Sequence, residues 1–309
     1  MNILGIGESV LDNVYMTNDM SMGVDVISSS AQKHVGGPVI AALILLSRLG
    51  LDCTLVTTLG RDEDAKLIKR TLKRENITLV GKMQKKTKIH TVIVNTNNGQ
   101  RKKIRGDVQH PPIRGLSRKF LHQFDLIILD RHEHTAFYEI LKKKKNTAKI
   151  LIDPSTEISP FTLDMIKHAD YPIIPIEALT KLNTGKDLYT CLNILFQSTS
   201  KSLTITAGEL GSFIYNGKEV SLLPSLQIKP VDVTGAGDIY RGGFAYGVTQ
   251  GWELSECANF GNLVAAIQCA RIGNVAAIPT KQEIELFKNI FVPKKDVNER
   301  SISTYFAQL

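Results

Sequence analysis

The stretch Pro230–Gly251, with the sequence PVDVTGAGDIYRGGFAYGVTQG, decides the fold of this chain. An apolar, β-favouring run, Leu226–Val231, precedes a glycine-bracketed segment, Gly235–Asp238. A helical pattern of small and apolar residues follows over Ile239–Thr249. This order predicts a strand, a tight loop and a helix that begins near Gly235.

The start of such a helix is a candidate anion site. Backbone N–H groups of the first turn have no partner within the helix, and glycines let a phosphate approach them. Asp238 would repel that anion. Its presence is explained if it accepts a proton from an attacking hydroxyl, while the amides of Gly235, Ala236 and Gly237 hold charge that develops on a phosphoryl group. The alternative is a glycine-rich helix start in which Asp238 only favours the dipole.

The extended pattern is more specific than the loop alone. Asp232 and Thr234 precede Gly235–Asp238, and Gly242–Phe244 follows. The pattern resembles the C-terminal signature of the ribokinase-like (PfkB) carbohydrate kinase family. The resemblance implies that Asp238 is the catalytic base, that the preceding amides form an anion hole, and that Asp232 helps bind a monovalent cation such as K⁺.

Composition describes a soluble globular chain. It has 309 residues, of which 43% are hydrophobic. No signal peptide is visible after Met1, and the longest apolar stretch, Val39–Leu46, is too short to cross a bilayer, which needs about 20 residues. The cysteines lack metal-ligand spacing and suit a reducing compartment. We therefore expect a cytoplasmic protein that does not bind a membrane. The cysteines are Cys53, Cys191, Cys257 and Cys269.

The formal net charge is +8. Basic residues concentrate in Lys82–Arg105 and Lys142–Lys145. The first segment lacks interleaved aromatic residues, and no nucleic-acid-binding module is recognisable. We expect solvated basic faces that attract anionic substrates such as ATP, and no nucleic-acid partner. Nucleic-acid binding by Lys82–Arg105 is the alternative.

The N-terminal third predicts a strand and a small lid. Asn2–Gly7 reads as a buried strand, and Val10 stands where a dinucleotide fingerprint has its third glycine, which disfavours a Rossmann dehydrogenase. Val24–Ile27 is strand-like, and Asn98-Gly99 marks a hairpin. The resemblance implies a β-sheet lid formed by about residues 12–34 and 88–107. Polar strands of this kind bury little unless substrate or a second copy covers them, so we expect a homodimer through the lid.

The resemblance also implies residues that bind the acceptor. Asp12 would bind its hydroxyl groups, although by itself Asp12 reads as a turn residue. Gly36 and Gly37 would let it lie against the backbone, and Arg105 leads back toward the site. Arg131 would hold an anionic group or pair with a local carboxylate. Ala41 stands where the family has an asparagine, which removes one polar contact to the acceptor. The acceptor of ribokinase therefore cannot be assigned to this chain.

From Phe124 onward, strand-like and helix-like segments alternate, which is typical of a parallel sheet with helices on both faces. Ligands of such sheets bind at the carboxyl ends of strands, where Asp130 and Asp153 lie. We expect one doubly wound, mostly parallel α/β domain over residues 1–309 with an inserted lid, and we interpret Ser301–Leu309 as a tail. The alternating segments are Leu126–Asp130, Thr135–Lys144, Ala148–Asp153, Phe161–His168, Tyr171–Ile174 and Ile176–Leu182.

Two further regions concern the nucleotide. The resemblance implies that Thr206, Gly208 and Gly211 contact ATP, with Asn259 and Asn262 near the adenine; small residues there are otherwise core packing. The family's N-x-x-E motif is absent. Ile176 and Leu179, or Ile174 and Glu177, stand in its place, as in a sulfofructose kinase-like subgroup. Magnesium is then held mainly by phosphates and water.

Together these patterns predict an ATP- and Mg²⁺-dependent kinase that phosphorylates a hydroxyl, typically a primary one, of a small sugar-like molecule. A nucleoside kinase of the same fold is one alternative. A catalytically silent nucleotide- or sugar-binding regulator is another, motivated by the missing N-x-x-E motif and Ala41. The sequence leaves the acceptor open.

Overall fold

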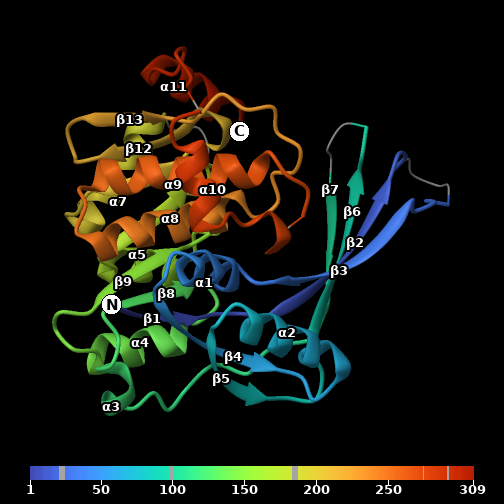
Figure 1. Cartoon of the computed structure of the whole chain (residues 1–309). Helices are drawn as coiled ribbons and strands as arrows, with labels where there is room; N and C mark the ends of the chain where they lie inside the picture. Colours follow the sequence, from blue (N-terminus) through green and yellow to red (C-terminus); the bar gives the residue numbers. More distant parts are fainter. Residues whose placement is uncertain (21–24, 98–100, 183–186, 274, 291) are drawn as a thin grey trace.

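The computed structural model describes residues 1–20, 25–97, 101–182, 187–273, 275–290 and 292–309. A nine-stranded sheet forms its centre, and a separate four-stranded sheet stands beside it (Figure 1). The predicted mostly parallel sheet is confirmed: among its described strands, all neighbours pair parallel except β11 with β12 and β12 with β13, which pair antiparallel. Across the sheet the strands are β13 (Val220–Pro224), β12 (Gly211–Tyr215), β11 (Leu203–Thr206), β10 (Tyr171–Pro175), β9 (Lys149–Asp153), β8 (Leu126–Asp130), β1 (Asn2–Ile6), β4 (Asp52–Leu59) and β5 (Thr78–Met83).

Helices cover both faces of this sheet, because its strands bury side chains alternately on either side. Ile3 and Ile128 point into one hydrophobic core, and Leu4 and Ile127 point into the other. The first core is covered by α1 (Pro38–Arg48), α2 (Glu63–Arg74), α8 (Ala236–Gln250), α9 (Leu254–Cys269) and α10 (Lys281–Phe287). The second is covered by α3 (Arg118–Leu121), α4 (His134–Lys143), α5 (Pro160–His168), α6 (Ile176–Leu179), α7 (Leu188–Thr199) and α11 (Glu299–Gln308).

The strand order reverses at β1. From this central strand the chain builds β4 and β5 on one side, then crosses over to β8 on the other. In doubly wound sheets a crevice opens at such a switch point, outside the carboxyl ends of the strands. The fold therefore directs attention to the residues that follow β1, β8 and β9.

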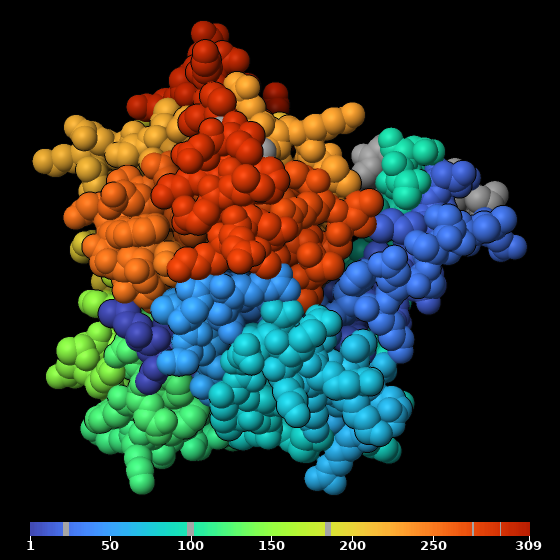
Figure 2. All heavy atoms as spheres, in the orientation of Figure 1, coloured from blue at the N-terminus to red at the C-terminus, as the bar shows by residue number. Residues whose placement is uncertain are grey.

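The smaller sheet is formed by the segments expected to form a lid, and we refer to it as the lid. Its strands are β3 (Ser30–Gly36), β2 (Val10–Thr17), β6 (Lys88–Asn95) and β7 (Arg101–Arg105), in that order across the sheet. Figure 2 shows it as a projection beside the C-terminal half of the body. β6 and β7 pair antiparallel, as a hairpin requires; the predicted turn at Asn98-Gly99 lies outside the described residues.

Two predicted strands are wrong. Val24 lies outside the described residues, and 25–27 form no strand; the lid pairs instead through β3, whose polar sequence has no apolar alternation to reveal it. Leu226–Val231 contributes only an isolated bridge from Leu226 to Pro293. Pro230 has no N–H to donate, and the N–H of Val231 bonds the Cys269 carbonyl at the end of α9.

The C-terminal residues are not a tail. Ser301–Leu309 lies almost wholly in α11, which begins with a capping box at Asn298. Ile302 and Phe306 are buried in the second core, 2% and 8% exposed. Their spacing of four residues puts both on one helix face, a pattern too short to stand out in the sequence. Among the described helices, none is long and apolar enough to cross a membrane.

The docking of α11 predicts a stability difference. Ile302→Ala should lower the free energy of unfolding by about 2–5 kcal/mol, because it leaves a cavity in the second core. Thr304→Ala, at an exposed position of the same helix, should change it by less than about 0.5 kcal/mol. Urea unfolding followed by circular dichroism measures both. Equal, small effects would mean that α11 does not pack on the body.

Candidate active site

The start of α8 has the predicted loop-to-helix geometry. Gly235 is its N-cap at φ 80°, a left-handed conformation that favours glycine. The Ile239 N–H bonds the Gly235 carbonyl at 3.0 Å, so the amides of Gly237 and Asp238 precede the helical hydrogen-bond ladder. A Cβ added to Gly237 would meet no atom within 4 Å, so its side faces open space. Ala236, also predicted to line the anion hole, instead donates its N–H to the Val233 carbonyl at 3.3 Å.

Asp232 fixes the loop that leads into α8. Its carboxylate accepts the Thr234 N–H at 2.9 Å and the Gly273 N–H at 3.2 Å. Gln268 donates from its side chain to the Thr234 carbonyl at 2.6 Å. The loop is therefore held from the end of α9, before any ligand binds.

Asp238 and Arg241 lie one turn apart on α8. The Asp238 side chain is 28% exposed and its Oδ1 lies 3.4 Å from Arg241 Nη2. The same Nη2 donates to Asp153 Oδ2 at the carboxyl end of β9. Arg241 is 2% exposed, and its Nε and Nη1 find no acceptor among the described residues. Burial opposes its charge, but Asp153, Asp238 and Asp130 outweigh burial, so the pKa of Arg241 lies above its ordinary value.

Sequence reasoning did not identify Arg241. The signal was present, because an arginine stands within a helix otherwise made of small and apolar residues, three positions after Asp238. Such a spacing places both side chains on the same helix face. What the sequence could not reveal is the partner, Asp153, which lies 88 residues earlier.

The residues after β1 and β8 are bound together. Asp130 accepts the Glu8 N–H at 2.8 Å and the His132 N–H at 2.9 Å, one with each oxygen. It therefore fixes both turns at the switch point. Arg131 Nε lies 3.0 Å from Glu157 Oε2. The sequence left open whether Arg131 holds an anionic group of the acceptor or pairs with a local carboxylate, and the contact observed is the second.

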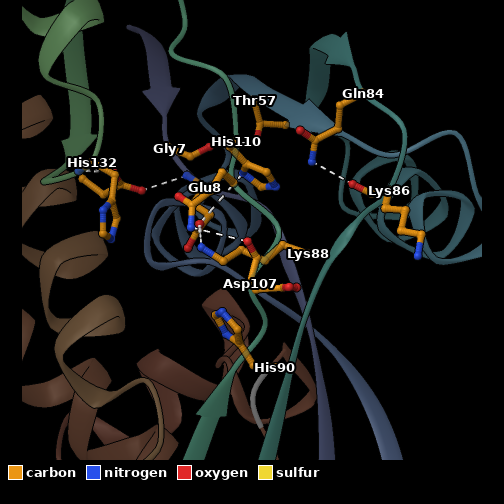
Figure 3. A network of polar contacts seen from close by, with 12 residues as sticks. Gly7, Glu8, Thr57, Gln84, Lys86, Lys88, His90, Asp107, His110 and His132 are labelled. Atoms are coloured by element: carbon orange, nitrogen blue, oxygen red, sulfur yellow. Dashed lines mark hydrogen bonds and ion pairs between the residues drawn. The ribbon is translucent and has the colours of Figure 1, made fainter.

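Glu8 also links the body to the lid. Figure 3 shows Lys88 and His110 pointing toward the Glu8 carboxylate. Lys88 begins β6, and His110 lies on the segment that returns from β7 to the body. Nearby, Thr87 donates to Asp62 through its N–H at 2.7 Å and through its hydroxyl at 2.6 Å. These contacts fix the base of the lid to the loops that follow β1 and β4.

Asp12 lies on the lid against the predicted glycines. A Cβ on Gly36 would come within 2.6 Å of Asp12 Oδ2, and a Cβ on Gly37, at φ 126°, within 2.3 Å of the Glu8 carbonyl. His90 Nδ1 and Lys103 Nζ lie 3.3 and 3.4 Å from Asp12 Oδ1. Burial opposes ionisation of Asp12, but the contacts with His90 and Lys103 outweigh burial, so the pKa of Asp12 lies below its usual value.

The predicted nucleotide residues fall into two groups. Thr206, Gly208 and Gly211 form the turn between β11 and β12, where both glycines have positive φ. A Cβ on Gly211 would come within 2.4 Å of the Leu223 carbonyl. Asn259 is exposed on α9, whereas Asn262 is buried and donates to the Leu223 carbonyl at 2.8 Å. Asn262 therefore ties α9 to β13.

The position of the absent N-x-x-E motif lies at the end of β10. Ile176 and Leu179 are both fully buried in the second core. Glu177, between them, accepts the Tyr305 hydroxyl from α11 at 3.3 Å. In one register of the motif, Ile176 and Leu179 offer no oxygen ligand. In the other, Glu177 offers a carboxylate but the fully buried Ile174 offers none, so neither register supplies both polar residues of the motif.

A buried carboxyl group lies beside this edge. Glu133, at the N-cap of α4, is 7% exposed, and its Oε2 finds no hydrogen-bond partner among the described residues. Burial and the neighbouring charge of Asp130 raise the pKa of Glu133 to about 8. Its protonated form is therefore favoured at neutral pH.

Comparisons with known proteins show the family and the fold of the chain. A family model described as pfkB family carbohydrate kinase matches residues 2–281. Ribokinase of Bacillus subtilis is 24% identical over 301 residues, covering 92% of this chain and 98% of that protein. Ribokinase of Lactococcus lactis is 28% identical over 144 residues, covering 46% of each chain. The crystal structure of a putative ribokinase from Agrobacterium tumefaciens matches with a TM-score of 0.83 at 21% identity, covering 94% of this chain and 97% of that one.

Glu133 predicts a pH dependence of stability. The pKa of Glu133 is about 8 in the folded chain against an ordinary value of 4.5, so between these pH values the folded state binds more protons than the unfolded state. The free energy of unfolding should therefore fall as pH rises through this interval, by up to about 1.4 kcal/mol per pH unit. Glu133→Gln should flatten the slope, and Glu285→Gln, at an exposed position, should not. Urea unfolding across the interval measures this; equal slopes in wild type and Glu133→Gln would contradict it.

The Arg241 cluster predicts a second stability effect. Arg241→Met leaves the Asp153 carboxylate, only 10% exposed, without its partner, and should lower the free energy of unfolding by about 3–5 kcal/mol. Asp238→Asn should lower the free energy of unfolding by a smaller amount, because the Asp238 side chain is 28% exposed. The double variant Arg241→Met/Asp153→Asn should lose less free energy of unfolding than the two single variants together, since no unpaired charge remains at residue 153. Strict additivity in urea unfolding would show that the pair does not interact.

Proposed function

The chain belongs to the pfkB family of carbohydrate kinases, and we propose that it transfers the γ-phosphate of ATP to a hydroxyl, typically a primary one, of a sugar or sugar derivative. The family match and the similarity to ribokinases make it a phosphotransferase of the sugar and nucleoside kinase type. The proposal also includes which residue is the base, which amides form the anion hole and which class of molecule is the acceptor.

One observation carries the proposed mechanism: a partly exposed carboxylate, Asp238, stands beside backbone amides that precede the α8 ladder. In the proposed reaction, Asp238 accepts the proton of the acceptor hydroxyl as its oxygen attacks the γ-phosphate. The amides of Gly237 and Asp238, with that of Gly235, donate to the oxygens of the transferred group. Arg241 acts as a positioning residue that holds the Asp238 side chain toward the carboxyl ends of β8 and β9.

ATP would lie along the glycine turn of Thr206, Gly208 and Gly211, with its phosphates toward α8. Asn259 is available to the base, whereas the side-chain amide of Asn262 is already bonded within the fold. Ile176 and Leu179 do not fit the role of ordering magnesium-bound water. Magnesium, when bound, neutralises phosphate charge and would be held chiefly by the nucleotide and water.

We retain three further expectations as parts of the proposal. Asp232 would contribute to a monovalent-cation site, because a carboxylate keeps lone pairs beyond the two N–H bonds it accepts here. The chain would act in the cytoplasm. It would form a homodimer through the lid, where Ile104 is 53% and Tyr15 36% exposed.

A catalytically silent regulator is the second candidate. The burial of Ile176 and Leu179 favours it, because the motif they replace orders magnesium-bound water in the family. The presence of Asp238 at the start of α8 disfavours it, since a protein that only binds nucleotide needs no base. ATP consumption over a panel of sugars and nucleosides, with magnesium and potassium present, discriminates the two: binding without turnover favours the regulator.

The proposed base predicts the effect of Asp238→Asn. Turnover with the best acceptor of the panel should fall by about 10²-fold or more, because the acceptor hydroxyl loses its proton acceptor. ATP affinity, measured by isothermal titration calorimetry, should be retained. Glu285→Gln, at an exposed position of α10, serves as the control and should keep normal turnover. Unchanged turnover in Asp238→Asn would remove this residue from the role of base.

A further inference from the structure

One face of the lid carries an accumulation of lysine, arginine and histidine side chains. The strand registers pair Asp12 with His34 and with His90, and they pair His90 with Arg105. Residues paired in register point to the same face of a sheet, and so do residues two positions apart. Lys88 and Lys103 therefore share this face. The measured contacts of Asp12 with His90 and Lys103 agree with that arrangement. We call His34, Lys88, His90, Lys103 and Arg105 the basic face of the lid.

The base of the basic face meets the carboxyl edge of the central sheet. Lys88 pairs with Glu8, which follows β1 (Figure 3). The Glu8 N–H bonds Asp130 at the end of β8. Asp130 is in register with Asp153 on the next strand. Asp153 in turn pairs with Arg241, one turn from Asp238. A continuous line of polar contacts and neighbouring strand ends thus leads from the proposed base to the basic face.

The charges on this face do not balance. Asp12 is its carboxylate and pairs with Lys103, with His90 also within 4 Å; the charge of Lys88 is matched by Glu8. Neither Arg105 nor His34 forms an ion pair within 4 Å with a carboxylate of the described residues. His90 is 5% exposed, and its Nε2 has no hydrogen-bond partner in the described part of the chain. A buried polar atom of this kind is stabilised by a ligand oxygen or by water.

We propose that Arg105, Lys103 and His90 bind an acidic group of the acceptor, so that the acceptor is an acidic sugar or a sugar phosphate. This inference rests on the proposed kinase function and names its substrate class. Arg105 is exposed and Lys103 is 42% exposed, so both can reach a bound molecule. A guanidinium matches a carboxylate or a phosphate with two parallel hydrogen bonds, and a neutral sugar offers no charge to balance the face.

The first arm of the test compares acceptors that differ in the acidic group. ATP consumption is measured with ribose against ribose 5-phosphate, fructose against fructose 6-phosphate, and sorbitol against gluconate. The acidic member of at least one pair should have the higher kcat/KM, by about 10- to 100-fold, the effect of one or two charge-assisted hydrogen bonds. The phosphate and carboxylate pairs separate the two sources of the charge. Preference for the neutral member in every pair overturns the inference and leaves the proposed function intact.

The second arm uses variants of β7 that lose the same charge on opposite faces. Arg105→Gln should raise the KM for the acidic acceptor by about 10- to 100-fold with little change in kcat, and Arg105→Lys should give an intermediate KM. Lys102→Gln is the matched control, because Lys102 is also exposed but pairs with Ile93 on the other face. Equal KM values for Arg105→Gln and Lys102→Gln overturn the inference.

The third arm measures binding of the acidic acceptor without depending on turnover. Fructose 6-phosphate and gluconate should raise the thermal unfolding midpoint of wild type and Lys102→Gln, and raise it less for Arg105→Gln, since ligand binding to the folded state stabilises it. Absence of turnover with every acceptor would contradict the proposed kinase function. Equal thermal shifts in both variants would contradict the acidic-acceptor inference, whatever the turnover.

Discussion

The ion pair between Arg241 and Asp153 joins the helix that carries Asp238 to the carboxyl edge of the central sheet. Because Arg241 is almost fully buried, its charge can persist only with carboxylates around it. The helix is fixed on its other sides by close packing: a Cβ on Gly242 would come within 3.1 Å of the α1 backbone, and one on Gly243 within 3.0 Å of the α9 backbone. The position of Asp238 is therefore set by the body of the protein and not by a ligand.

The lid is attached to this body by polar contacts at its base. Asp62 holds Thr87 at the entry to β6, and Glu8 holds Lys88 and faces His110 on the return from β7. Both carboxylates come from loops that follow strands of the central sheet, so the lid and the switch point share their supports. An acceptor bound beneath the lid would meet a rigid polar edge on one side and the cationic residues of the lid on the other.

Sequence reasoning succeeded where a pattern is local. The apolar runs Asn2–Gly7 and Leu126–Asp130 predicted strands near the observed bounds of β1 and β8. It failed where the partner decides the conformation. β3 is polar and pairs because β2 lies beside it, Leu226–Val231 is held by the end of α9, and α11 is a helix whose two buried residues find a core already formed. Arg131 and Asn262 likewise form contacts with partners that no spacing reveals.

The sequence by itself determined the family, the doubly wound fold and the loop that begins α8, because glycines, a proline and apolar periodicity act within a few residues of one another. Only the tertiary structure decided that Asp238 has Arg241 and Asp153 as neighbours, that Ile176 and Leu179 are core residues, and that the cations of β6 and β7 share a face with Asp12. Those facts depend on strand register and on contacts between residues far apart in the chain, which charge and spacing along the sequence do not encode.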